Sequence, residues 1–586
     1  MLHWIRPKDV RENYEESQKL FALPTHTQCK EKTQQILSEA YQRDDAMTVQ
    51  VSPHVIQDAQ LLDALAPETS TVQHGGHEWV RHQIQSPIHS IPQLKLRQTD
   101  LQIVRHQPIP DDTVGTIAGV ENVLWALDLP PLNKSWPLPL LFPQWFALRW
   151  VNHQPTLLNL YHLYRIYGAP LSHFIYPLTL FFGPWWYIRT KLKWKLPLTT
   201  YVGFIKKAIV ELVKIRTRDI REVFIKITTI VVYVGLYIYG LIQSLDIAYM
   251  LHQTRRTLLD RISRIHTFIQ TTQYQWAHYG FTDTTLATWN LKTPLVTGVT
   301  TPQLSQTIQG IYQLFHSQRF HPLLKHTLLQ AYTLQGIQTI ARHPAMFREV
   351  RWRRPTATAS PAPMLKFTEM GHPMLSSDQQ RNPAILSKNL ILTGPNAAGK
   401  STYVRGILAN ILMAQTFGVC DARSAIVSPI KTIASLMRVQ DVVGTNSLFE
   451  AECRRSLELI QRAQENHPMI LFLDEPMNAT PPIEGAATAM ALVKYLSQFP
   501  HVRLIVTTHY HVLSNLETLC PARFRNVSME ASTHPIQFTY KLKAGPSFQS
   551  IAIEMLEKDA FPEELLKDAI EFKNKICRIE DNTSRQ

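Results

Sequence analysis

A glycine-rich loop between an expected strand and an expected helix constrains the fold of this chain more than any other feature. The loop runs from Gly394 to Ser401 and fits the pattern GxxxxGK[ST]. An apolar run, 384–393, enters the loop as a buried strand would, and a helical pattern, 402–415, leaves it. Backbone N–H groups of such a loop, with the positive end of the next helix, surround phosphate groups. The sequence therefore predicts an α/β domain that holds a nucleotide.

The residue types in the loop predict separate roles. Lys400 is expected to reach the β- and γ-phosphates, and the Ser401 hydroxyl is expected to bind Mg²⁺. ATP and Mg²⁺ are therefore the predicted cofactors. The predicted ATP-binding residues are Gly394, Pro395, Asn396, Ala397, Ala398, Gly399, Lys400, Ser401 and Thr402.

Two further apolar runs end in residues that suit phosphate chemistry. The run 469–473 is followed by Asp474 and Glu475. A buried acid pair is tolerated only with a cation or a proton, so Asp474 is predicted to hold Mg²⁺ through water and Glu475 to polarise the attacking water. The run 502–506 leads to His509, which is predicted to sense the γ-phosphate. Together these residues predict an ATP hydrolase with Glu475 and His509 in catalytic roles.

Composition leaves three kinds of partner open. The chain has 60 Lys and Arg against 46 Asp and Glu, a net charge of +14. A basic surface can serve nucleic acid, anionic lipid or nucleotide phosphates. The five cysteines form no CxxC pair, so we expect a reducing compartment and neither a zinc site nor a disulfide framework. The N-terminus becomes charged too early for a signal peptide.

The motifs together resemble those of the MutS family, relatives of the ABC-type ATPases. The segment 393–407, TGPNAAGKSTYVRGI, is similar to the family's TGPNxxGKSTYxRxx, and 507–510, TTHY, is similar to its THY element. Gly-His-Pro at 371–373 resembles the GRHP element that precedes the ATPase strands. The resemblance implies a P-loop ATPase domain of the MutS type.

A fourth segment resembles a MutS element that acts between subunits. The residues 446–452, NSLFEAE, look like the family's STFxxE segment, which lies against the nucleotide of the opposite subunit in MutS dimers. The resemblance implies a homodimer with composite sites. Ser447 would approach the γ-phosphate in trans, and Phe449 and Glu452 would shape the interface.

The resemblance extends beyond the ATPase motifs at both ends. Residues 543–569 resemble the C-terminal helix-turn-helix by which MutS subunits dimerise, and 71–98 look like the start of the family's core, or lever, domain. The chain departs from the repair enzymes because the lever begins so early that we expect no mismatch-reading or connector domain. Two prolines, Pro481 and Pro482, also stand in the loop after Glu475, where the family has Gly-Arg-Gly-Thr-Ser.

Two apolar segments occupy the place of the MutS DNA clamp. The first is 171–188, where Pro177 and Pro184 are expected to break any helix. The second is 227–244, and a membrane span needs about twenty apolar residues. The link 189–226 holds eleven Lys or Arg and three acids, a net of +8. Such a basic, amphipathic stretch suits an anionic membrane surface, and it also suits the phosphates of DNA.

The charge pattern favours one membrane arrangement among the alternatives. A two-span hairpin would place the +8 link on the far side, although positive residues prefer the cytosolic side. We therefore expect a re-entrant or monotopic hairpin, with the ATPase on the cytosolic side. The alternative is a soluble protein of the nucleoid or nucleus, in which 227–244 is a buried lever helix or a dimer interface.

The predicted fold class is mixed, with a mostly helical lever region, an apolar helical insert, a C-terminal α/β P-loop ATPase domain and a small helix-turn-helix. The predicted function is a MutS-like ATPase that couples ATP hydrolysis at composite dimer sites to a membrane-associated helical module. The alternative is a DNA-binding mismatch-repair or recombination-type homologue with a reduced clamp. The predicted domains are 1–50 (N-terminal helical segment), 51–165 (first lever part), 166–250 (apolar, basic insert), 251–350 (second lever part), 364–530 (ATPase) and 531–586 (helix-turn-helix).

Overall fold

The structure is a computed structural model, and its chain divides into two compact units. The first unit comprises 1–29, 115–274 and 294–328, and the second comprises 30–114, 275–293 and 329–586. The domain boundaries drawn from the sequence stay predictions. The structure describes residues 22–41, 44–65, 74–108, 117–129, 141–213, 220–292, 307–316, 320–343, 347–353, 361–376, 378–437, 448–533, 536–549 and 551–583.

A seven-stranded sheet is the centre of the second unit, and its strand order is β1-β8-β9-β10-β5-β11-β12. The pairs from β1 to β11 are parallel, and β11 and β12 form an antiparallel hairpin. Consecutive residues of β5, β9 and β10 are buried, which requires cover on both faces of the sheet. The strands are β1 (Gln50–Val51), β5 (Asn389–Thr393), β8 (Thr432–Leu436), β9 (Met469–Asp474), β10 (Val502–Thr507), β11 (Phe524–Thr533) and β12 (Ile536–Ala544).

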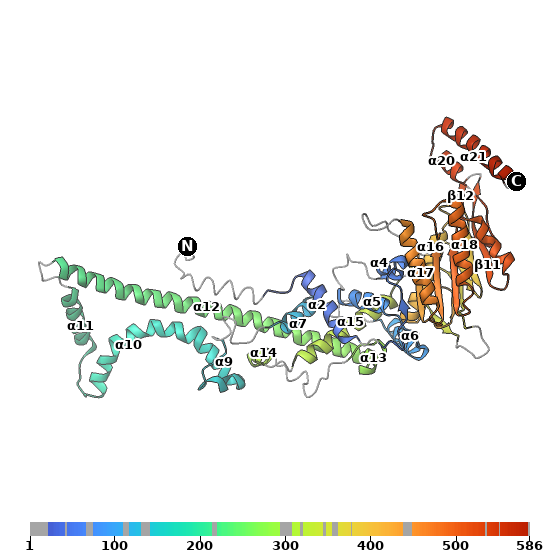
Figure 1. Cartoon of the computed structure of the whole chain (residues 1–586). Coiled ribbons are helices and arrows are strands. Elements are labelled where there is room, and N and C mark those ends of the chain that lie inside the picture. The colour runs from blue at the N-terminus through green and yellow to red at the C-terminus, as the bar shows by residue number, and fades with distance from the viewer. Residues whose placement is uncertain are drawn as a thin grey trace. The chain divides into compact units, whose positions relative to one another are not determined.

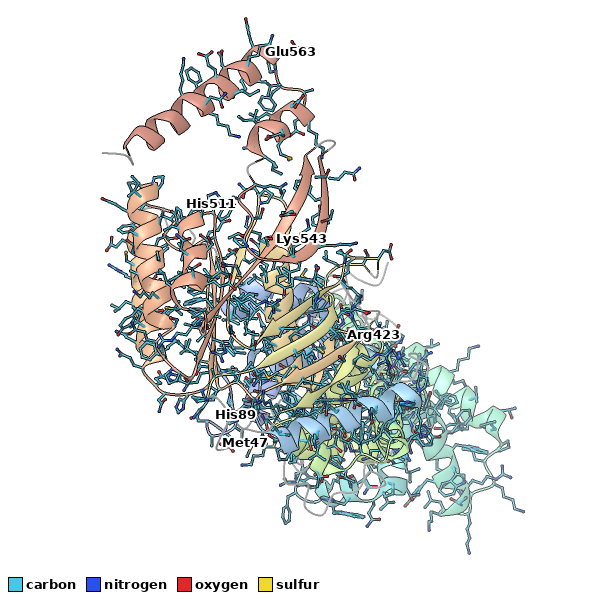
Figure 2. All side chains as sticks on the ribbon, turned by 90° about the vertical axis from the view of Figure 1, so that its right-hand side faces the viewer. Met47, His89, Arg423, His511, Lys543 and Glu563 are labelled. Atoms are coloured by element: carbon cyan, nitrogen blue, oxygen red, sulfur yellow. The ribbon has the colours of Figure 1, made fainter. Side chains whose placement is uncertain are left out.

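A second sheet of the same unit has five strands in the order β4-β3-β7-β2-β6. Its strands are β2 (Phe347–Trp352), β3 (Leu365–Met370), β4 (Asn382–Leu386), β6 (Val419–Asp421) and β7 (Ser424–Val427). The helices that accompany the two sheets are α16 (Lys400–Phe417), α17 (Leu448–Ala463), α18 (Pro482–Leu496), η7 (His511–Ser514) and α19 (Asn515–Leu519). Two C-terminal helices follow, α20 (Ala552–Lys558) and α21 (Glu563–Thr583). Figure 2 labels Lys543 on the β11–β12 hairpin and Glu563 at the start of α21.

Helices that precede β2 in the chain complete the second unit. They include α2 (His26–Ala40), α3 (Val55–Ala59), α4 (Leu61–Leu65), α5 (His74–Gln85), α6 (Ile91–His106), α13 (Asp283–Thr288) and α15 (Phe320–Ala341). A short N-terminal strand, β1, joins the ATPase sheet at its edge, with Gln50 opposite Thr432. Met47 and His89, both labelled in Figure 2, are joined by a 2.9 Å backbone hydrogen bond beside this strand. The helical N-terminal region and the C-terminal α/β sheets confirm the predicted mixed fold class.

The first unit is helical within the described residues. Its elements are α7 (Ile117–Leu127), η4 (Arg149–His153), α9 (Pro155–Leu163), a π-helical turn η5 (Tyr164–Gly168), α10 (Ala169–Thr190), α11 (Leu198–Val213), α12 (Ile220–His278) and α14 (Ile308–His316). In Figure 1, α10 and α11 lie near the N-terminal half of α12. A ring contact of 6.4 Å joins Tyr167 of η5 to His252 of α12.

The expectation that prolines break the first apolar segment is wrong, because α10 continues through Pro177 and Pro184. Proline has no N–H, so the carbonyl four residues before Pro177 loses its usual donor. That carbonyl belongs to His173, and it accepts a 2.9 Å hydrogen bond from the Tyr237 hydroxyl of α12. At Pro177 a neighbouring helix thus supplies the donor that the proline lacks, which lets the helix continue past this residue.

The second apolar segment lies within α12, the one helix among the described residues that is long and apolar enough to cross a membrane. None of its most apolar window is buried inside the structure. Every residue from Phe224 to Tyr239 is exposed, on all sides of the helix. The alternative of a lever helix buried within the chain is therefore wrong.

Candidate nucleotide site

The glycine-rich loop lies between the central strand β5 and the helix α16, as the sequence predicts. Gly394 has φ 143°, and a Cβ there would lie 2.2 Å from the backbone oxygen of Met529. Gly399 has φ 93°, in the left-handed region that favours glycine. Both glycines are therefore required by the backbone path that brings the loop over the end of the sheet.

Lys400 is the first residue of α16 and is 5% exposed. Its Nζ donates to the backbone oxygens of Gly394 at 2.8 Å and Pro395 at 3.2 Å. Burial lowers the pKa of the lysine, and the carboxylates of Glu475 and Asp474 oppose that shift. The loop therefore gathers a buried cation and a helix N-terminus at one point, which is the electrostatic setting that phosphate groups need.

Ser401 and Asp474 lie together, as expected for a magnesium site. The Ser401 hydroxyl donates to Asp474 Oδ1 at 3.2 Å. Thr507 also donates its hydroxyl to that oxygen, because β9 and β10 pair in a register that places Asp474 opposite Thr507. Hydroxyl and carboxylate oxygens are ligands that Mg²⁺ prefers, so the residues present fit the ion.

Glu475 and His509 form the acidic and basic pair of the site. Glu475 Oε1 lies 2.5 Å from His509 Nε2, and the same nitrogen lies 3.4 Å from Lys400 Nζ. The hydrogen bond from His509 lowers the pKa of Glu475, against the effect of burial. The Glu475 backbone has φ 52° and its N–H donates to Thr507 O at 3.0 Å. The carboxylate is thus held ionised at the strand end beside the phosphate loop.

A cavity of about 340 Å³ lies beside the loop. Its walls are mostly apolar and include Gly399, Tyr403, Met529 and Tyr540, together with His372. Two of its lining residues, Gly399 and Thr402, are among the predicted ATP-binding residues, and Gly371 and His372 belong to the Gly-His-Pro motif, but the sequence did not predict the cavity itself. Tyr540 gave no signal in the sequence, because β12 brings it to the loop from the far end of the domain. An apolar cavity next to a phosphate loop suits the flat base of a nucleotide.

The predicted trans-interface residues are found in different settings. Ser447 lies outside the described residues. Phe449, in the first turn of α17, is 39% exposed. Glu452 is 7% exposed, and its carboxylate accepts a 3.4 Å hydrogen bond from the Ala479 N–H of the same chain. Burial raises the pKa of Glu452, and the backbone hydrogen bonds that it accepts oppose that shift.

The loop after Glu475 is tied to the helix-entry residue Tyr510. The Tyr510 hydroxyl donates to Met477 O at 3.0 Å, and Met477 itself has φ 63°. Pro481 and Pro482 then lead into α18. The loop is therefore held at Met477 by Tyr510 and at Ala479 by Glu452.

The phosphate loop follows a buried central strand, the acid pair ends the second strand away, and the histidine follows the strand between them. This arrangement is that of a P-loop ATPase. Residues 390–577 match the model of MutS domain V, an ABC-type ATPase domain. The C-terminal part of the chain is therefore a MutS domain V, which confirms the resemblance and the predicted ATPase class.

Curated MutS proteins are similar to about a third of the chain. The DNA mismatch repair protein MutS of Geobacillus sp. (strain WCH70) is 33% identical over 201 residues, which cover 34% of this chain and 23% of that protein. The MutS of Roseiflexus castenholzii is 31% identical over 186 residues, 31% of this chain and 17% of the relative. The MutS of Listeria monocytogenes serotype 4b is 31% identical over 193 residues, 32% of this chain and 22% of the relative. The chain thus matches only about a fifth of the length of these relatives.

Proposed function

We propose that the chain is an ATP hydrolase that works as a homodimer with composite sites and couples hydrolysis to a membrane-associated helical module. The observation that carries the enzymatic part is the contact of Glu475 with His509 beside Lys400. The MutS domain V match supports ATP and Mg²⁺ as cofactors.

Each residue of the site has a defined task in this proposal. Lys400 and the loop N–H groups bind the phosphates, while Ser401 and Asp474 hold Mg²⁺. The metal ion, when bound, would neutralise the charge that develops between the β- and γ-phosphates. Glu475 orients and polarises the attacking water, and His509 holds the Glu475 carboxylate and contacts the γ-phosphate.

The enzymatic proposal is tested with Glu475→Gln. Loss of a general base costs about 10²–10⁴-fold in rate. We expect turnover to fall by at least about 100-fold while ATP still binds. Glu465→Gln removes an exposed carboxylate of the same domain and is the control. Equal turnover in Glu475→Gln and the control would remove Glu475 from the mechanism.

The dimer proposal rests on the C-terminal helices and on α17. Exposed apolar side chains lie in α21, just before it and just before α20, and a second copy of the chain would cover them. These side chains are Phe548, Phe561, Leu565, Ile570 and Phe572. Phe561→Asp with Phe572→Asp should yield monomers in light scattering and lower turnover, because each site would lose its partner's Ser447 and Phe449. A dimer of unchanged stability would refute this role of the C-terminal helices.

The membrane proposal rests on two neighbouring helices with long uncharged stretches. From Ile166 to Ile188 and from Ile227 to Leu245 the chain has no Asp, Glu, Lys or Arg. Basic residues lie at both ends of the first stretch and directly before the second, where they can meet anionic headgroups. Asp246 directly follows the second stretch, and Arg255 and Arg256 come next on that side. The basic residues that flank the two stretches and are described in the structure are Arg165, Arg189, Lys191, Lys193, Lys195, Arg221, Lys226, Arg255 and Arg256. We expect the protein to float with vesicles that contain anionic lipid, and recovery at the bottom of the gradient would refute the membrane proposal.

DNA binding is a second candidate function, and it rests on α11. Lys206 and Lys207 are exposed on this helix, and phosphate contacts lose affinity steeply as salt rises. If α11 binds DNA, the change of both lysines to Glu should weaken salt-sensitive binding. An unchanged affinity for DNA would exclude α11 from such a contact.

A further inference from the structure

The end of α16 opposite the phosphate loop lies in a socket built by residues from the N-terminal half of the chain. A helix leaves its last carbonyls without partners from its own turns. In α16 these carbonyls accept hydrogen bonds from residues outside the helix. Gln415 O accepts from the Ile88 N–H at 2.8 Å, and Thr416 O accepts from Arg97 Nη1 at 2.6 Å. The Gly418 carbonyl, just past the helix, accepts from Gln98 Nε2 at 2.6 Å. The helix that begins with Lys400 is thus anchored at its far end by the segment 88–98.

Arg97 is the central residue of this socket and is 0% exposed. Its Nε donates to Thr288 O at 3.0 Å, and its guanidinium lies 4.7 Å from the centre of the Trp289 ring. Burial lowers the pKa of Arg97 to about 9, while Tyr41 and Asp100 oppose the shift. A cation at the C-terminal end of a helix is stabilised by the helix dipole. One side chain of α6 therefore joins α16 to α13.

Gln98 and Gly418 fit each other closely at the same point. Gly418 has φ 76°, and a Cβ on it would lie 2.5 Å from Gln98 Cγ. Gln98 Nε2 also donates to Val350 O at 2.9 Å, so that it joins α16 to β2. The Phe417 ring lies 6.2 Å from that of Trp289, which closes the apolar side of the socket. The contact therefore combines charge, two amide hydrogen bonds and ring packing.

We propose that Arg97 and Gln98 are positioning residues that pass a displacement of α16, caused by ATP at its N-terminus, to the helices α6 and α13. The proposal rests on the proposed ATPase function. A buried helix that is held at both ends moves as a rigid body, because packed interiors do not deform continuously. The contacts of Arg97 and Gln98 connect its far end to three other elements, and removal of these contacts should separate ATP binding from the response of the core.

The test follows amide hydrogen exchange in the full-length protein with the Glu475→Gln change, with and without Mg-ATP. Bound ATP is measured in the same samples with a fluorescent analogue. With Arg97 and Gln98 intact, we expect ATP to slow exchange both in α16 and in α6 and α13. In Arg97→Met and in Gln98→Leu the change in α16 should remain and the change in α6 and α13 should disappear. Lys95→Met, which removes an exposed charge from the same helix, should behave as the unmodified protein.

The outcomes separate this inference from the proposed function. If no ATP binds when Arg97 and Gln98 are intact, the proposed function fails. If ATP binds and the response of α6 and α13 persists in both variants, the coupling role is refuted. Arg97→Lys keeps the charge and should recover part of the response, which a merely structural loss of packing would not predict. Gln98→Leu removes no charge, so it decides the question if Arg97→Met does not fold.

Discussion

Gly394→Ala tests the geometric reasoning on the phosphate loop most directly. At φ 143° an alanine is strained, which costs about 1–3 kcal/mol. The new Cβ would also lie 2.2 Å from Met529 O, a backbone atom that cannot rotate away. Strand β11 would have to move off β5 near the pair Ser528 and Thr393, and each lost hydrogen bond costs about 1 kcal/mol. We expect a total local cost of about 3–5 kcal/mol.

Hydrogen exchange of the β5 and β11 amides measures this cost as a fall in the opening free energy. The ATP affinity, measured by titration with a fluorescent analogue, should fall by more than about tenfold, since tenfold corresponds to only about 1.4 kcal/mol. Gly545→Ala is the matched control, because Gly545 has φ 87° but open space around its Cβ position. Gly545→Ala therefore introduces backbone strain without a steric clash. Equal effects of the two changes on exchange and on affinity would refute the assignment of Gly394 as a glycine required by close approach.

Three further predictions concern the groups around the site. Tyr510→Phe removes the hydrogen bond to Met477 O, so turnover should fall several-fold while the affinity for ATP is unchanged. An unchanged turnover would mean that this hydrogen bond does not position the loop after Glu475. The lowered pKa of Glu475 stabilises the fold above the ordinary pKa of 4.5, and this stabilisation is lost as pH falls through the lower pKa of the folded state. Glu475→Gln should therefore flatten the pH dependence of thermal stability below about pH 4.5. A pH profile of unchanged slope would contradict this. Asn410 is fully buried and forms hydrogen bonds with Gly371 O, Gly406 O and the Asp421 N–H. Asn410→Leu should therefore lower the free energy of unfolding by about 2–4 kcal/mol. A variant as stable as the original would show that these hydrogen bonds contribute little.

The part of the site that could be predicted from the sequence consists of short motifs whose residues lie close together in the chain. The loop at 394–401 predicts its own fold because strand, glycines, lysine and helix follow one another without interruption. Asp474 and His509 were found because each ends an apolar strand, and parallel strands bring such ends to one edge of a sheet. The contact of Ser401 with Asp474 follows from that topology.

The contacts that the sequence did not reveal join distant residues. Arg97 reaches Thr416 across 319 positions. Arg97 lies in the segment 71–98 that resembles the start of the lever domain, but that resemblance does not indicate the contact. Likewise, the helix α10 was missed because the donor that replaces the proline N–H comes from Tyr237, 64 positions after His173. Local propensity at Pro177 predicts a break, and a contact from another helix reverses that prediction.

The exposed surface of α12 distinguishes between the surroundings that could contact it, because a protein partner or lipid must match the shape of that surface. A second helix or a groove on a partner contacts a stripe along one side of a helix. From Phe224 to Tyr239 the exposed residues occupy all sides, and the neighbouring α10 is likewise exposed over most of its length. Lipid chains surround a helix on all sides, and in that setting a helix that keeps its own backbone hydrogen bonds needs no further partner. The membrane proposal requires this distribution of exposed side chains, whereas a dimer contact along one stripe of the helix would leave many of them exposed.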